Sequence, residues 1–201
     1  MTLSRKEGWD MVRVWMIAEA TLYDRLKAER VLYVDPTLTD EDFGDAYAWM
    51  RGQMALHIPG YGGHWPWWAW VRPPCGCVRP DLRKRQLYHN GWPAGTACMR
   101  LELDVPDIEL LLSDFDMWHA VLNNSPLVSS DEEWDTIEAL PEPQQRSVKE
   151  ATWPRLFALA EPPDPFWDGT DRQRTVQACF ETLRLADVYA VTLFRTRPTR
   201  W

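Results

Sequence analysis

Apolar and charged residues alternate most regularly between residues 96 and 105, where every second position from Met99 to Val105 is apolar. A period of two predicts a strand with one buried face. Other segments are rich in β-branched and aromatic residues, which also favour strands. These segments are residues 12–18, 65–71, 175–183 and 188–194, with a brief extended piece at residues 31–34.

Apolar positions spaced three and four residues apart predict four helices. Thr39, Ser113 and Ser130 stand where the N-cap of a helix is expected, and Asp42 and Glu133 complete capping boxes after the first and the last of these. The four helical segments are residues 20–29, 39–57, 113–124 and 130–140.

Residues 141–170 follow a different pattern, in which prolines alternate with acidic and aromatic residues. This composition is typical of a surface excursion or insertion. The other elements run as strand and helix, helix, strands, helices and strands, which predicts an α+β fold rather than regular βαβ units. A length of 201 residues suits a single domain, residues 1–201. We therefore expect a compact, mixed or antiparallel sheet core with flanking helices.

The net charge of −8 is unevenly distributed along the chain. Residues 102–171 hold 17 acidic and three basic side chains, whereas residues 72–100 hold six basic side chains and one acidic. The overall negative field disfavours binding to a nucleic acid strand. The basic segment could hold a phosphate-bearing small molecule, and it could equally be a solvated loop.

Hydrophobic residues make up 45% of the chain. They form no run of about 18 apolar residues, the length that a membrane-spanning helix needs. The first residues include Arg5 and Lys6 and lead into a mixed stretch rather than the apolar region of a signal peptide. We expect a cytoplasmic protein without membrane contact, as a monomer or a dimer.

A single glycine separates Cys75 from Cys77, the closest pair among the four cysteines. Structural zinc sites ordinarily contain a second cysteine pair or a histidine pair, and His64 and His89 are isolated. We expect free thiols, as in a reducing compartment, and no metal site.

A polar stripe on the predicted helix of residues 113–124 offers candidate chemistry. Asp116, His119 and Asn123 lie three and four residues apart, so the carboxylate could orient the imidazole. Such a pair can act as a general base with its orienting partner, or as a clamp on a ribose or an amide. A helix cap beside a half-buried histidine explains the same residues. Asp114 faces away from Asp116, which disfavours one metal ion shared by this group.

Several common catalytic motifs are absent from the sequence. It contains no Gly-x-Ser-x-Gly, no Gly-x-Gly-x-x-Gly and no phosphate loop. The hydroxyl of Ser113 is expected to bond the helix backbone, so serine hydrolase chemistry is disfavoured as well.

Four of the 13 tryptophans are gathered between residues 65 and 70. On a strand, Trp68 and Trp70 point to one side and Trp67 points to the other. Such rings could line an aromatic cleft that stacks on nicotinamide, adenine or another planar group. A core strand that is covered on both sides explains the same pattern.

Three stretches carry a resemblance to a bacterial family of domains of unknown function. They are Trp67-Trp-Ala-Trp70, the Leu-Leu-Ser-Asp-Phe-Asp-Met-Trp-His run of residues 111–119 with its continuation to Asn124, and the closing residues 176–188. Together with the opening strand they cover most of the chain outside residues 141–170. The resemblance brings no activity with it.

The layout of the chain also resembles that of small ADP-ribosyltransferases of the DNA-targeting toxin type. Those enzymes open with a strand, a helix and a short extended piece, like residues 12–34 here. A central strand and a ribose-facing Asp/Asn motif follow, which residues 101–116 resemble. They end on a strand with a catalytic glutamate and a short return strand, which residues 177–183 and 188–194 resemble.

This second resemblance implies roles for particular residues around a bound NAD. Glu181, or else Gln177, would lie beside the ribose and stabilise the positive charge that develops as nicotinamide departs. Trp70 would stack on the nicotinamide and Arg72 would meet the pyrophosphate. Trp15 occupies the first-strand position where those enzymes place a histidine or an arginine. The remaining expected contacts come from the motif and its helix, namely Asp114, Asp116, His119 and Asn123.

The resulting first hypothesis is an NAD-dependent ADP-ribosyltransferase-like enzyme. It would use NAD as a substrate and either transfer ADP-ribose to a protein or nucleic acid target or hydrolyse NAD. The alternative is a non-catalytic binding module with a tryptophan-lined cleft for a nucleotide or a peptide. The missing first-strand histidine or arginine favours this alternative.

Overall fold

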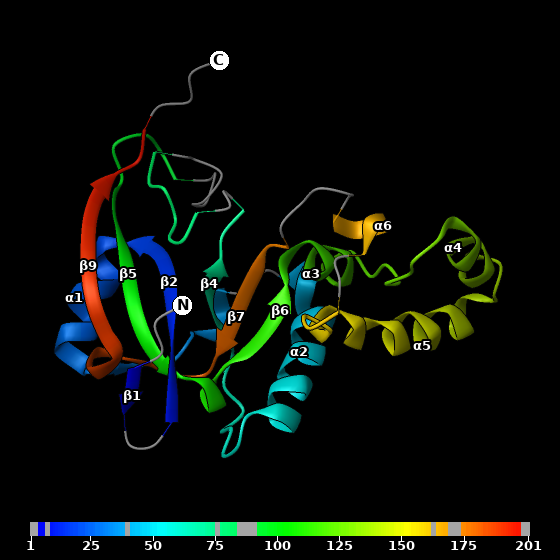
Figure 1. Cartoon of the computed structure of the whole chain (residues 1–201), viewed down its shortest axis with the longest axis horizontal. Helices are drawn as coiled ribbons and strands as arrows, with labels where there is room; N and C mark the ends of the chain where they lie inside the picture. The colour runs from blue at the N-terminus through cyan, green and yellow to red at the C-terminus, as the bar shows by residue number, and fades with distance from the viewer. Residues whose placement is uncertain are drawn as a thin grey trace.

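An antiparallel sheet of seven strands forms the centre of the protein (Figure 1). The computed structural model describes residues 4–6, 9–38, 41–74, 77–83, 92–161, 164–168 and 174–197. The strand order is β6-β7-β4-β2-β5-β9, and β1 pairs with β2. The strands are β1 (Ser4–Lys6), β2 (Trp9–Glu19), β4 (Trp67–Arg72), β5 (Ala97–Pro106), β6 (Leu111–Asp114), β7 (Val176–Phe180) and β9 (Val188–Arg195). With the helices described below, they make an α+β fold.

Two halves of this sheet meet at a single point. β2 lies beside β5 along its whole length, from Met11 opposite Pro106 to Glu19 opposite Cys98. β4 is aligned with β2 through the pair Trp15 and Trp70, whereas its other neighbour β7 runs beside it from Trp67 onward. Beyond Trp15, β2 and β4 therefore diverge, and the sheet opens as a fork.

The first face of the sheet carries the larger apolar cluster. Alternate residues of β5, including Leu101 and Leu103, are fully buried here, as the sequence pattern predicted. Helix α1 (Ala20–Glu29) covers this face and contributes Leu26, which is also fully buried. α1 begins and ends at the residues expected from the sequence, and its C-cap Arg30 has the positive φ of 69° that ends many helices.

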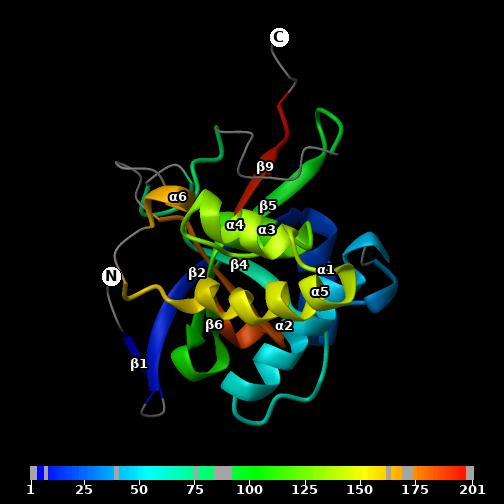
Figure 2. The same cartoon turned by 90° about the vertical axis from the view of Figure 1, so that its right-hand side faces the viewer.

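The second face is covered over β4, β7 and β6 by α2 (Gly44–His57) and α3 (Phe115–Leu122) (Figure 2). Met50 and Met54 of α2 are fully buried there with Cys179 of β7. Aromatic contacts join the sheet to the helices, since the rings of Trp68 on β4 and Trp118 on α3 lie 5.1 Å apart. Sheet and helices thus share a second apolar core.

A further group of helices lies beyond α3, at the right of Figure 1. It consists of α4 (Asp131–Glu138), α5 (Glu142–Thr152), a 3-10 turn (Trp153–Phe157) and α6 (Pro165–Asp168). Most of it falls in the segment expected to be an excursion. Nevertheless, Trp153 and Leu156 are buried in the second core, at 2% and 0% exposure.

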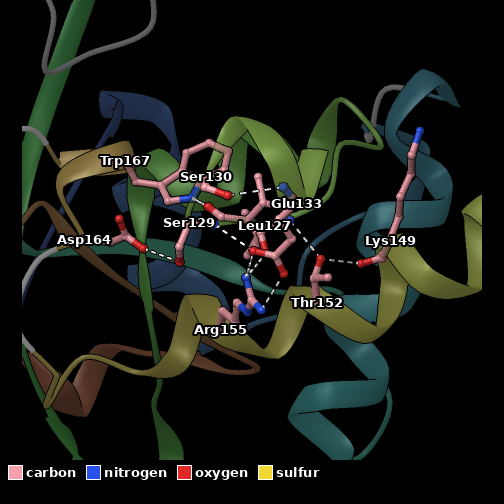
Figure 3. A network of polar contacts seen from close by, with 10 residues as sticks. Leu127, Ser129, Ser130, Glu133, Lys149, Thr152, Arg155, Asp164 and Trp167 are labelled. Carbon is pink, nitrogen blue, oxygen red and sulfur yellow. Dashed lines mark hydrogen bonds and ion pairs between the residues drawn. The ribbon is translucent and has the colours of Figure 1, made fainter. Parts of the chain in front are cut away.

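Polar contacts also fasten this helical group to the segment that follows α3 (Figure 3). Arg155 bonds both carboxylate oxygens of Glu133 and donates to the carbonyl of Leu127 at 2.7 Å. The indole of Trp167 donates to the carbonyl of Val128 at 2.6 Å. The proline-rich segment is therefore anchored at several points rather than loosely attached.

Helix boundaries differ from the sequence expectation at two places. The helix expected from Thr39 begins at Gly44, after two 3-10 turns (Pro36–Leu38 and Glu41–Phe43), and Thr39 itself lies outside the described residues. The cap expected at Ser113 was wrong, because Ser113 belongs to β6 and Asp114 caps α3 instead. The cap expected at Ser130 is confirmed, since its hydroxyl accepts from the amide of Glu133.

The two closing strands are present but are not neighbours. β7 pairs with β4 and β6, whereas β9 pairs with β5 in the other half of the sheet. Between them, β8 (Leu183–Arg184) pairs with β3 (Val31–Leu32) in a separate two-stranded sheet. This crossing carries the chain from one half of the main sheet to the other. Among the described residues, no helix is long and apolar enough to span a membrane.

Candidate functional site

A cavity of about 310 Å³ lies where β2 and β4 diverge, and we call it the fork cavity. Its volume falls within the range of small-molecule sites, roughly 300–1,000 Å³. Both strands, α1, the start of α2 and the loop that precedes β4 contribute to its wall. The lining residues are Met16, Ile17, Ala18, Leu22, Val34, Phe43, Tyr47, Trp65, Pro66, Trp67 and Trp68.

Aromatic rings make up much of the wall of this cavity. Tyr47 of α2 lies 5.6 Å from the ring of Trp65 and meets Trp68 edge-on at 6.3 Å. Burial raises the pKa of the Tyr47 hydroxyl above its ordinary value, so this group stays a neutral donor in the physiological range. A wall of this kind offers ring faces for stacking and few charges.

The loop that carries Trp65 to the cavity is fixed by two side chains. Glu181, directly after β7, accepts hydrogen bonds from the backbone amides of Gly62 at 2.9 Å and His64 at 3.0 Å. Arg51 of α2 donates to the carbonyl of Gly63 at 2.5 Å and lies over the Trp65 ring at 5.3 Å. Glu181 therefore positions an aromatic wall through the backbone of the loop.

A second feature lies beside the cavity, on the second face of the sheet. Strand register places Ser113 opposite Gln177, Gln177 opposite Trp70, and Trp70 opposite Trp15. Trp15 is in turn opposite Glu102. Directly opposed residues of antiparallel strands share a face and have Cβ atoms about 5 Å apart. These five residues therefore form one continuous line, which we call the cross-strand row.

The interior of the cross-strand row is polar and buried. Ser113, Gln177 and Trp15 are exposed by only 0%, 5% and 7%. Within the described part of the chain, the Ser113 hydroxyl, the Gln177 amide nitrogen and the Trp15 indole nitrogen have no hydrogen-bond partner. Buried polar atoms without partners are uncommon, because each costs about 1–3 kcal/mol. The unpartnered atoms of the row thus lower the free energy of unfolding of the protein.

A charged pair closes one end of the cross-strand row, and a second pair follows the other end along the strand β6. At one end the carboxylate of Glu102 is 2.9 Å from Arg100, and both side chains are buried. At the other end, Asp114 follows Ser113 along β6 and so alternates to the opposite face of the sheet, where its carboxylate is 3.1 Å from Arg174. Both carboxylates are therefore paired with guanidinium groups, and the three unpartnered polar atoms of the row belong to neutral side chains.

The structure brings several of the predicted site residues together. Trp15, Trp70 and Gln177 are neighbours in the cross-strand row. The Trp70 ring lies 4.8 Å from that of Phe115, which in turn lies 4.3 Å from His119. None of these residues lines the fork cavity itself, although Trp15 and Trp70 are each two positions from a lining residue on the same face, Ile17 and Trp68.

Glu181 lies apart from this group. It follows β7 at the end opposite Gln177, four residues or about 13 Å along an extended chain. Its carboxylate is bonded to the loop amides of Gly62 and His64. The expected convergence of Glu181 with Trp70 on one cleft is therefore absent from this arrangement.

The polar stripe of α3 forms contacts within its own helix. The His119 imidazole bonds the carbonyl of Phe115 at 2.8 Å, and Asn123 donates to the carbonyl of His119 at 2.7 Å. The amide of Asp116 donates to the Asp114 carboxylate at 2.9 Å. In the described residues no hydrogen bond joins Asp116 to His119, so the expected orienting contact is not formed.

Asp114 and Arg72 have structural partners in this fold. Asp114 is 1% exposed and caps α3 through the amides of Asp116 and Met117. Arg72 is exposed at the end of β4, where its guanidinium is 3.5 Å from the carbonyl of Arg174.

The expectation of free thiols holds for Cys98 and Cys179, which are free and buried. It was wrong for Cys77, which is disulfide-bonded. Among the described residues, no group of three or more His, Cys, Asp and Glu side chains could hold a metal ion.

Sequence reasoning missed Ser113, Glu102 and Tyr47 as parts of this region. Ser113 was expected to be a helix cap, whereas Leu111 to Asp114 form a short strand in which Ser113 and Asp114 are both buried. Glu102 was expected on the polar side of β5, and the loop of residues 77–83 now covers it, with Arg79 3.7 Å away. No local signal marked Tyr47, since its place in the wall depends on how α2 packs.

Comparison with known families identifies the family of this chain. Residues 13–139, more than half of the chain, match the model of a domain of unknown function, DUF3841. The chain therefore belongs to the DUF3841 family, which spans β2 through α4 and so includes most of the wall of the fork cavity. No curated protein and no solved structure matches the chain significantly.

Proposed function

We propose that this protein binds a planar, nucleotide-like small molecule in the fork cavity. The observation that supports this most is the cavity itself, with tyrosine and tryptophan rings around about 310 Å³ where the sheet divides. Apolar pockets with a few convergent polar groups are the usual form of small-molecule sites. The mostly uncharged wall suits a ring system better than a peptide with charged side chains.

NAD and its fragments are the first ligands to test. The proposal takes NAD from the likeness of the chain's layout to ADP-ribosyltransferases. A planar base would stack between Tyr47 and the tryptophans of β4 and the preceding loop. Arg79, whose side chain is 63% exposed near the Glu102 end of the cross-strand row, offers a cationic group for a phosphate.

Thermal unfolding with NAD, nicotinamide, ADP-ribose and adenosine tests this proposal. A ligand at about 100 times its Kd stabilises the folded state by about 2.7 kcal/mol, a shift of several degrees. Trp65→Ala should abolish the shift, since it removes one cavity wall. Phe166→Ala, which removes an exposed aromatic ring on α6, should leave the shift unchanged. No stabilisation by any of the four compounds, or an equal shift in Trp65→Ala, would contradict the proposal.

ADP-ribosyl transfer or NAD hydrolysis is the second candidate. Departure of nicotinamide leaves positive charge on the ribose, which a fixed carboxylate stabilises. Glu102 favours this candidate, because it is a buried carboxylate directly opposite Trp15 on the same face. Glu181 is bonded to loop amides and would act through the position of Trp65. The acceptor, whether protein, nucleic acid or water, stays open.

Release of nicotinamide from NAD, followed by chromatography, separates the two candidates. For a transferase or hydrolase we expect turnover that Glu102→Gln abolishes, and that Glu181→Gln reduces mainly through weaker binding. For a binding module we expect stabilisation by NAD without release of nicotinamide. Turnover that survives Glu102→Gln would exclude Glu102 as the catalytic carboxylate.

A further inference from the structure

We infer that the cross-strand row is a polar subsite for an uncharged, carbonyl-bearing group, such as a carboxamide, of the ligand in the fork cavity. This inference rests on the proposed function and extends it to the chemistry that the site selects. It is carried by three neutral polar atoms without partners, on three different strands, in one line. These atoms are the Ser113 hydroxyl oxygen, the Gln177 amide nitrogen and the Trp15 indole nitrogen.

The subsite adjoins the cavity on the same face of the sheet. Trp70 and Trp15 belong to the cross-strand row, while Trp68 and Ile17, two positions along each strand, line the cavity. Two residues of a strand span about 7 Å, roughly the length of one ring and its substituent. A ring stacked at Trp68 could therefore direct a substituent toward Trp15 and Gln177.

The type of hydrogen bonding on offer determines which group fits. An indole N–H is only a donor, the amide nitrogen of Gln177 also donates, and the Ser113 hydroxyl can do either. Their common complement is a group that accepts hydrogen bonds. A carbonyl oxygen meets this requirement.

The charges around the cross-strand row favour an uncharged group over an anion. Of its five residues Glu102 alone is charged, and its carboxylate is paired with Arg100. An anionic group in the row would lose its hydration and find the Arg100 guanidinium already engaged by a carboxylate. A carboxamide carries the same accepting oxygen without that cost.

A functional subsite has a stability signature that needs no ligand. Replacing a buried unpartnered polar group by an apolar one of similar size removes a desolvation penalty and stabilises the fold. We expect Gln177→Met and Ser113→Ala each to raise the Tm by about 2–4 °C. The matched control is Gln145→Met, because the Gln145 amide donates to the carbonyls of Glu138 and Leu140 at 2.9 and 2.8 Å. It should lower the Tm.

Ligand selectivity supplies the second arm of the test. Benzamide and benzoate share a planar ring and differ in charge, so their Kd values for the full chain can be compared by ligand-observed NMR. We expect wild type to bind benzamide at least about tenfold more tightly. Gln177→Met and Ser113→Ala should reduce that preference about tenfold, since each removes one hydrogen-bonding partner. Trp65→Ala should weaken both ligands alike.

The outcomes separate this inference from the proposed function. Equal binding of benzamide and benzoate to wild type would overturn the amide subsite and leave the stacking cavity standing. A fall in Tm for both Gln177→Met and Ser113→Ala would also overturn it, because the polar atoms would then have structural roles. If neither ring compound binds wild type, the proposed function fails first and this inference with it.

Discussion

The Glu181 carboxylate holds the backbone of Gly62, whose amide nitrogen is 2.9 Å from both carboxylate oxygens. The contact joins residues that are 119 positions apart in the chain. It sets the course of the loop into Trp65 and hence one wall of the fork cavity. A residue that the ADP-ribosyltransferase resemblance assigned to catalysis therefore has a positioning role in this structure.

Substitution of Gly62 tests that role directly. A Cβ at Gly62 would lie 3.0 Å from the Glu181 carboxylate oxygen, which is tighter than nine in ten real Cβ contacts, so the carboxylate would have to move by a few tenths of an ångström. We expect Gly62→Ala to destabilise the protein by about 1 kcal/mol and to weaken ligand binding. Gly52→Ala is the control, because a Cβ there meets nothing within 4 Å on the helix α2. It should stabilise by about 0.5–1 kcal/mol in urea denaturation. Equal effects of the two substitutions would contradict the positioning role.

Asp114 should be a more sensitive helix cap than Ser130. Its carboxylate accepts from two amides of α3 and pairs with Arg174, which is itself only 7% exposed. Asp114→Ala leaves that guanidinium buried without its carboxylate, so we expect a loss of about 3–5 kcal/mol. Ser130→Ala, at the cap of α4, should cost about 1 kcal/mol. Denaturation in urea measures both, and a similar cost for the two caps would be inconsistent with the buried ion pair.

The free cysteines should be unreactive in the folded protein. Burial raises the pKa of both thiols above the ordinary value, and far above it for Cys179. Because the thiolate is the reactive species, a maleimide at pH 8 should label neither residue in the native state. Labelling should appear in 8 M urea, a condition in which both are exposed, with mass spectrometry as the readout. Rapid native labelling of Cys179 would show that β7 is accessible to solvent.

Acid should weaken the contact between Glu133 and Arg155 (Figure 3). The Arg155 hydrogen bonds, together with one from the Ser129 amide, lower the pKa of Glu133 below the ordinary 4.5. The folded protein therefore holds this proton less tightly than the unfolded chain does. The stabilisation is present above the unfolded-state pKa and is lost as the pH falls through the lower folded-state value.

Both side chains are partly exposed, so this contribution should be only about 0.5–1 kcal/mol. Urea denaturation between pH 3 and pH 6 should show a shallower acid loss in Glu133→Gln than in wild type. Arg146→Gln, which removes an exposed pair with Asp45, is the control and should leave the slope near that of wild type. An unchanged slope in Glu133→Gln would refute this account.

Local patterns were sufficient to predict most of the secondary structure. The strand through Leu101 and Leu103 and the helix over residues 20–29 depend on neighbours in sequence, and both were found as expected. The expectation of only one buried face on that strand was wrong, because Arg100 and Glu102 are buried as well. Ser130 was found as a cap for the same reason, because a cap requires only the next three residues. Ser113 was assigned incorrectly because Asp114, beside it, is an equally good cap, and the pairing of β6 with β7 decided between them.

The site was only partly accessible from the sequence. Trp15, Trp70 and Gln177 were each identified as candidates. They are more than 50 residues apart from one another, and no local sequence pattern indicates that they lie opposite each other on neighbouring strands. Strand register brought them together. Glu181 is equally remote from Gly62 in sequence, so its contact with the loop amides could not be read from either segment.

The sequence by itself thus determined the α+β class, most of the elements and the aromatic and polar residues available for a site. Periodicity and capping involve residues that are close in sequence, so they can be recognised from the sequence alone. Only the tertiary structure decided that β2 and β4 meet at Trp15 and Trp70 and then diverge to form the fork cavity. That arrangement depends on packing and on strand pairing between residues more than 100 positions apart, such as Trp70 and Gln177. Both compete with local preferences, and burial of the whole core decides the outcome.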